Sequence, residues 1–138
     1  MRRATAAEQV NCAGDQRPLP PGWSTRRPTA ANEPAILAVV HASDIVAVGY
    51  PNFTSDEIHE ILNAPNMDPT RDSWLALDPA GEVVAWAYLD NPTAGPQDFA
   101  EVYVHPERGR PAQAPLLDLL LARARALAAE RGHAARSA

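Results

Sequence analysis

The chain has 138 residues, of which 46% are hydrophobic and 21% charged, and its formal net charge is −5. This length suits one domain with a core of its own. The acidic total argues against nucleic-acid binding, and no run reaches the roughly 20 apolar residues of a membrane span. All twelve basic residues are arginine, and the single cysteine, Cys12, has no partner for an internal disulfide. We therefore expect a cytoplasmic protein.

The N-terminal part of the chain divides into a leader and the start of a domain. Residues 1–22 are rich in proline and poor in apolar side chains, which predicts a disordered leader. The domain is expected to span residues 23–138. Its first strand is predicted at residues 23–27, and a helix follows in which Asn32 provides the N-cap. Pro34 falls in the first turn of that helix, where proline is tolerated.

A second helix is predicted to begin after Thr54, because residues 54–57 read Thr-Ser-Asp-Glu. This is a capping box, in which the side chains of Thr54 and Glu57 satisfy each other's free backbone donors. The helix is expected to end before Pro65.

The clearest hairpin joins residues 73–78 to residues 82–90. In its second strand Val83, Ala85, Ala87 and Leu89 share one face, and Val84, Trp86 and Tyr88 share the other. Both faces are apolar, so we expect helices on both sides of the sheet. A third strand follows at residues 98–104, and a last helix covers residues 113–131.

Charge is distributed unevenly along the chain. Residues 1–27 carry a net charge of +3, residues 28–103 carry −11, and residues 104–138 carry +3. The basic last third contains a strand, a short loop with two arginines and the start of a long helix. Backbone N–H groups and the helix dipole can hold an anion at such a position.

The order β-α-α-β-β-β-α, with Val104-His105-Pro106 and Arg108-Gly109-Arg110 before Leu116-Leu117, resembles the GNAT superfamily of acyl-CoA N-acetyltransferases. The resemblance covers roughly residues 23–132. It implies an α/β fold (an α+β mixed sheet) that stops before the final strands of the family. It also implies acetyl transfer from acetyl-CoA to a small-molecule or peptide amine, a reaction that needs no metal.

The resemblance implies a cofactor site at the end of the third strand. The residues concerned are Val102, Val104, Arg108, Gly109, Arg110, Pro111, Ala112 and Gln113. In the family, two glycines of this loop let backbone amides wrap the pyrophosphate, and here those two positions are Pro111 and Gln113. Proline has no N–H to donate, and glutamine adopts positive φ poorly. Two interpretations follow: a loop that binds phosphate through arginine side chains, or an inert helix cap.

The resemblance places Glu101 where some family members keep the carboxylate that deprotonates the amine. The alternative is a partly exposed carboxylate of the sheet without a catalytic role. Tyr103 is expected to be a packing residue.

Three functions therefore stay open. The first is an N-acetyltransferase domain with little or no activity as an isolated chain. The second is a non-catalytic, degenerate GNAT module that stabilises or regulates an adjacent active domain, as in the first domain of tandem family members. The third is an unrelated α/β interaction protein. Because no strand follows the last helix, residues 98–104 are expected to form an open sheet edge. Such an edge would pair with a second copy of the chain or with a missing C-terminal domain.

Overall fold

The computed structural model of the chain describes residues 2–3, 16–90 and 99–131. Cys12, the expected loop at residues 91–97 and the last residues of the chain lie outside this part. The elements are β1 (Arg2–Arg3), β2 (Ser24–Arg26), η1 (Ala30–Asn32), α2 (Glu33–Val48), α3 (Ser55–Leu62), β3 (Ser73–Leu77), β4 (Val83–Asp90), β5 (Phe99–Val104), η2 (Arg110–Ala112) and α4 (Gln113–Arg131).

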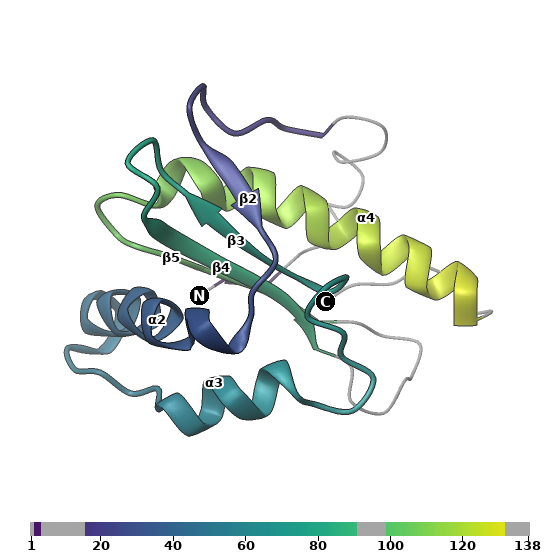
Figure 1. Cartoon of the computed structure of the whole chain (residues 1–138), viewed down its shortest axis with the longest axis horizontal. Helices are drawn as coiled ribbons and strands as arrows, with labels where there is room; N and C mark the ends of the chain where they lie inside the picture. The colour runs from purple at the N-terminus through teal and green to yellow at the C-terminus, as the bar shows by residue number, and fades with distance from the viewer. Residues whose placement is uncertain (1, 4–15, 91–98, 132–138) are drawn as a thin grey trace.

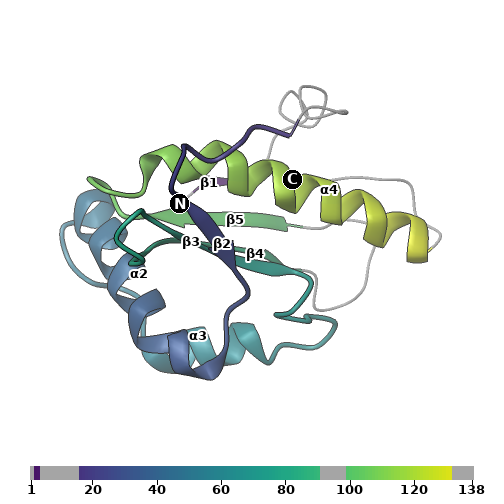
Figure 2. The ribbon, with the colours of Figure 1, turned by 45° about the horizontal axis from the view of Figure 1, so that its top comes forward.

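The strands form one sheet in the order β1-β5-β4-β3-β2, and neighbouring strands run antiparallel. Helices α2 and α3 cover one face, and α4 crosses the other (Figures 1 and 2). From β2 to α4 the order of elements is the predicted one. The α/β fold class and the helices on both faces are thus confirmed.

The two faces of β4 carry the two halves of the core. Ala85, Ala87 and Leu89 pack under α4. Trp86 and Tyr88 pack under α2 and α3. The predicted alternation fails at Val83, which packs on the α2 side instead. An irregularity in the β3–β4 pairing after Ala76 shifts the register and moves this residue to the other face.

The ends of the helices follow local sequence signals. The Thr54 hydroxyl accepts a hydrogen bond from the Glu57 N–H at 3.2 Å, which confirms the predicted cap of α3. Helix α2 ends at Gly49, whose φ of 87° suits glycine. Asn32 is the N-cap residue of α2, as predicted, but its side chain makes no capping hydrogen bond to that helix. The side chain accepts from the N–H of Thr29 and closes η1.

Residues 30–48 form a helical segment that is long and apolar enough to cross a membrane by length and composition alone. Core helices of soluble proteins pass the same test, and Ile36, Val39 and Val40 of this segment are buried against the sheet.

The N-terminal residues that the structure describes contact the domain. Strand β1 pairs with β5 through Arg2 and Val102 and through Arg3 and Glu101. The expectation of an open edge along β5 is therefore wrong over these two positions. Residues 16–17 bind α4, as described below, and Leu19 packs on the core. The division into a leader at 1–22 and a domain at 23–138 stays a prediction.

Candidate functional site

The loop from β5 to α4 folds back on itself directly after the strand. The His105 N–H donates to the Val84 carbonyl at 2.8 Å, and the Gly109 N–H donates to the His105 carbonyl at 2.8 Å. The His105 side chain stands inside this turn. Its Nδ1 accepts from the N–H groups of Glu107 and Arg108, both at 3.2 Å.

Gly109 is required by this close packing. A Cβ atom at position 109 would lie 2.2 Å from the Val84 carbonyl oxygen and 2.6 Å from the His105 nitrogen. The φ of Gly109 is −105°, so the residue is chosen for space and not for a left-handed backbone. Gly109, which stands at neither of the two glycine positions of the family loop, is thus a packing residue.

The second half of the loop is the short helix η2. Pro111 lies in its first turn and has no N–H. The Ala112 N–H donates to the Gly109 carbonyl at 3.0 Å, and the Gln113 N–H donates to the Arg110 carbonyl. Each of these N–H groups of the loop is thus directed to an acceptor inside the loop. A loop of this kind does not present them to a phosphate.

The two arginines of the loop point to different places. Arg108 Nη1 lies 2.9 Å from Glu82 Oε2, on the turn between β3 and β4. The Nε of Arg110 donates to the Pro106 carbonyl at 2.7 Å. The two guanidinium groups therefore do not form one cationic cluster.

A cavity of about 260 Å³ lies between the end of β5, the start of α4 and the C-terminal half of α2. It is lined by Ser43, Val46, Ala47, Val104, Pro106, Arg110 and Gln113. Three of the predicted cofactor residues, Val104, Arg110 and Gln113, meet here. The other five do not. Val102 and Ala112 are buried under α4, Gly109 is buried in the loop, Pro111 is exposed, and Arg108 lines another cavity.

An apolar surface adjoins this cavity at the end of α2. Ile45, Val46 and Val48 are between 51% and 68% exposed, and Tyr50 beyond the helix is 59% exposed. The same helix buries Ile36 against the sheet. A helix that is apolar on both its inner and its outer side is typical of one that a further partner covers. The sequence patterns did not single out this end of α2.

Glu101, the predicted base, is only 4% exposed. It pairs across the strands with Tyr88. Burial, then Tyr103 and Glu101, raise the pKa of Tyr88 above its usual range. Burial and the Glu101 carboxylate also raise the pKa of Tyr103 to about 12. Glu101 does not line the 260 Å³ cavity.

The surroundings of Glu101 are aromatic. Tyr103 stacks on Trp86 with ring centroids 5.8 Å apart, and Phe53 meets its edge at 5.9 Å. The hydroxyl groups of Tyr88 and Tyr103 are hydrogen-bonded to each other. Both phenols stay neutral at physiological pH, and in the hydrogen bond between them one hydroxyl donates and the other accepts. Tyr103 is buried, as expected, while the link to Tyr88 was missed, although the two-residue alternation along β4 places Tyr88 on this face.

Comparisons with known proteins agree with the fold. No protein-family model and no curated protein matches the chain. Among solved structures, a GCN5-related N-acetyltransferase from Sphaerobacter thermophilus is similar, with 27% identity and a TM-score of 0.56. That match covers 64% of this chain and 27% of the Sphaerobacter chain. A GCN5-related N-acetyltransferase from Kribbella flavida has 21% identity and a TM-score of 0.50 over 80% of this chain and 67% of its own.

The chain therefore contains a domain of the GCN5-related N-acetyltransferase (GNAT) fold. It spans about a quarter of the length of the Sphaerobacter protein and two thirds of the Kribbella protein.

Proposed function

We propose that this domain is a non-catalytic GNAT module, with little or no acetyl transfer of its own, that stabilises or regulates an adjacent catalytic domain. The observation that carries the proposal is the internal bonding of the loop after β5. The N–H groups of Glu107 and Arg108 go to His105, and those of Ala112 and Gln113 go to carbonyls of the loop. The residues present do not fit the pyrophosphate of acetyl-CoA, which a loop of this kind binds through free amides.

Two further observations support a role beside another domain. The exposed apolar end of α2, formed by Ile45, Val46, Val48 and Tyr50, offers such a domain a surface to cover. Most of the Sphaerobacter protein lies outside the part that matches this chain. In that protein the shared fold is accompanied by further polypeptide.

Calorimetric titration of acetyl-CoA tests the first half of the proposal. We expect no binding, or weak binding, by the unmodified chain. The double variant Pro111→Gly, Gln113→Gly should bind more tightly, because an amide donor and backbone freedom return to the loop. Pro111→Ala, Gln113→Ala restores the donor alone and separates the two effects.

Pro65→Gly, at an exposed position just after α3, is the matched control and should change nothing. Tight binding by the unmodified chain would contradict the proposal. So would a double glycine variant that gains no affinity although its circular dichroism spectrum is unchanged.

Acetyl transfer from acetyl-CoA to an amine, with Glu101 as the base, is the second candidate function. Glu101 lies close enough to Tyr88 and Tyr103 to raise the pKa of both phenols, which favours this function. Two more acidic residues, Asp44 and Glu57, also raise the pKa of Tyr103. Negative charge of this kind attracts a cationic amine. A transfer assay with small-molecule and peptide amines decides between the two: turnover that Glu101→Gln abolishes would favour the enzyme.

A further inference from the structure

A second cavity, of about 410 Å³, lies on the other side of the β5–α4 loop, away from the 260 Å³ cavity described above. Segments of β2, α2, the β3–β4 hairpin and the loop meet there. It is lined by Arg26, Asn32, Ala35, Ala38, Leu77, Gly81, Glu82, Val83 and Arg108. Its volume lies in the range of small-molecule sites, about 300–1,000 Å³.

The floor of this cavity is apolar. Ala35 and Ala38 are three residues apart on α2 and so lie on one side of the helix. Leu77 and Val83 stand opposite each other in the β3–β4 pairing. The hollow exists because the two helix residues are alanines, and a larger side chain at either position would fill it.

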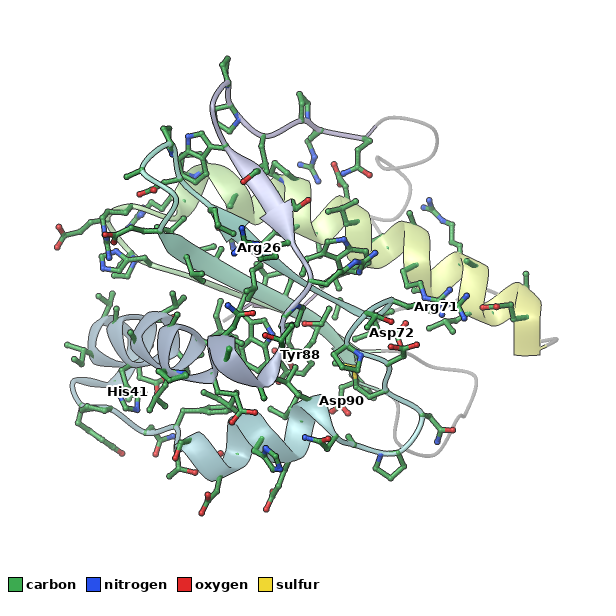
Figure 3. All side chains as sticks on the ribbon, in the orientation of Figure 1. Arg26, His41, Arg71, Asp72, Tyr88 and Asp90 are labelled. Atoms are coloured by element: carbon green, nitrogen blue, oxygen red, sulfur yellow. The ribbon has the colours of Figure 1, made fainter. Side chains whose placement is uncertain are left out.

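The rim of the cavity is cationic although the whole chain carries a net charge of −5. Arg108 is paired with Glu82, but the two side chains are 49% and 62% exposed, so the pair is weak. Arg26 projects from β2 on the side of α2 (Figure 3). Among the residues that the structure describes, no acidic side chain lies within ion-pair distance of Arg26.

Asn32 adds a neutral donor to this rim. Its Oδ1 is taken by the N–H and the hydroxyl of Thr29, so the amide NH₂ group is the part that remains for a ligand. Two guanidinium groups and an amide donor above an apolar floor match a carboxylate that carries a short hydrocarbon chain.

We propose that this cavity binds a small organic monocarboxylate. Its carboxylate lies between Arg26 and Arg108, with Asn32 as a further donor, and its chain lies on the alanines of α2. The ligand replaces Glu82 as the partner of Arg108, an exchange that costs little because the existing pair is exposed to solvent. The site is separate from the cavity at Arg110 and does not depend on the function proposed above.

The test is a titration of the ¹⁵N-labelled chain with hexanoate and with its neutral isostere hexanamide, followed by NMR. We expect hexanoate to shift the amide signals of residues 26, 32 and 81–83, and hexanamide to bind at least about tenfold more weakly. Arg26→Gln should weaken hexanoate binding by about tenfold or more, because a charge-assisted hydrogen bond is lost. Arg71→Gln, at an exposed arginine paired with Glu130, is the matched control and should bind normally.

Two more variants locate the site. Ala38→Leu fills the floor without changing any charge and should abolish hexanoate binding while the spectrum of the remaining chain is retained. Arg110→Gln should bind hexanoate as well as the unmodified chain does. No binding of hexanoate by the unmodified chain, equal binding of hexanoate and hexanamide, undiminished binding by Arg26→Gln, or loss of binding in Arg110→Gln would overturn the proposal.

Discussion

Two pairs of arginines behave differently: Arg17 and Arg123, which form ion pairs at α4, and Arg108 and Arg110 of the β5–α4 loop. Arg17 forms a fork on Asp118 of α4, with its Nη2 at 2.7 Å and its Nε at 2.8 Å from the carboxylate oxygens. Arg123 of α4 holds Asp72 at 2.7 Å. The two carboxylates are only 1% and 5% exposed.

The loop arginines have weaker partners. Arg108 meets the exposed Glu82, and Arg110 meets a backbone carbonyl of its own loop. The comparison shows that a basic segment is not by itself an anion site. What decides the role of each guanidinium is whether its acceptor is buried, because a buried carboxylate must be paired.

The largest expected effect is that of Arg17→Ala, which removes the guanidinium paired with Asp118. The Asp118 carboxylate lies among the leucines of α4 and would lose its fork. We expect the free energy of unfolding to fall by about 3 kcal/mol, since the buried carboxylate loses the guanidinium as its ionic partner and keeps the backbone N–H of residue 17. Urea denaturation of the purified chain measures it.

The double variant Arg17→Met, Asp118→Leu is the control. Replacing both partners by apolar residues should return most of the lost stability. A surface substitution changes the free energy of unfolding by about 0.5 kcal/mol or less. If Arg17→Ala cost no more than that, the Arg17–Asp118 pair would be as weak as the Arg108–Glu82 pair, and the two groups of arginines would not differ.

Gly109→Ala tests whether the loop is fixed by its own backbone packing. The new Cβ would meet the Val84 carbonyl, which cannot move without disturbing β4. We expect a loss of about 2–3 kcal/mol in thermal or urea unfolding. Gly81→Ala, at a φ of 82° with open space around it, is the matched control and should cost about 1 kcal/mol. Equal losses would mean that the contact with Val84 does not hold the loop.

Much of this architecture could be predicted from local patterns. The alternation from Ala85 to Leu89 predicted which residues lie on each face of β4, and Thr54 predicted the start of α3. The strand that carries Glu101 was likewise predicted, at residues 98–104, and is β5. These features depend on neighbours in sequence, so a single chain reveals them.

The remaining features depend on distant residues. Arg17 and Asp118 are 101 positions apart, and nothing local links a proline-rich leader to a helix near the other end. The internal bonding of the loop depends on the ring of His105, which accepts from two backbone N–H groups. The sequence shows a histidine after a strand but does not predict these hydrogen bonds. Missing glycines predicted a poor phosphate loop, and only the structure shows where its amides go instead.

The buried phenol of Tyr103 extends the comparison to the other face of the sheet. Burial and Glu101 raise the pKa of Tyr103 to about 12, against about 10 in the unfolded chain. Below pH 10 the phenol is neutral in both states. From pH 10 to about 12 only the unfolded chain loses the proton, so stability falls as pH rises through this window.

Urea midpoints measured from about pH 9 to about pH 12 should therefore decline, and Tyr103→Phe should reduce the slope. Tyr88, whose pKa is also raised, accounts for part of the decline that remains. Tyr50→Phe, at a tyrosine that is 59% exposed, is the matched control. An identical slope in Tyr103→Phe and in the unmodified chain would show that burial and Glu101 do not raise the pKa of the Tyr103 phenol.

The smallest expected effect belongs to Arg108→Gln, and it defines the second group of arginines. Arg108 and Glu82 are about half exposed, so water and salt screen their attraction. We expect the substitution to lower the free energy of unfolding by less than about 1 kcal/mol.

A double-mutant cycle with Glu82→Gln should give a coupling energy that is smaller still at high salt. The same cycle for Arg17 and Asp118 should keep its coupling in salt, because the Asp118 carboxylate is buried. If the Arg108 cycle matched the Arg17 cycle in size and salt response, the loop pair would be a structural latch, and its exchange for a bound carboxylate would no longer cost little.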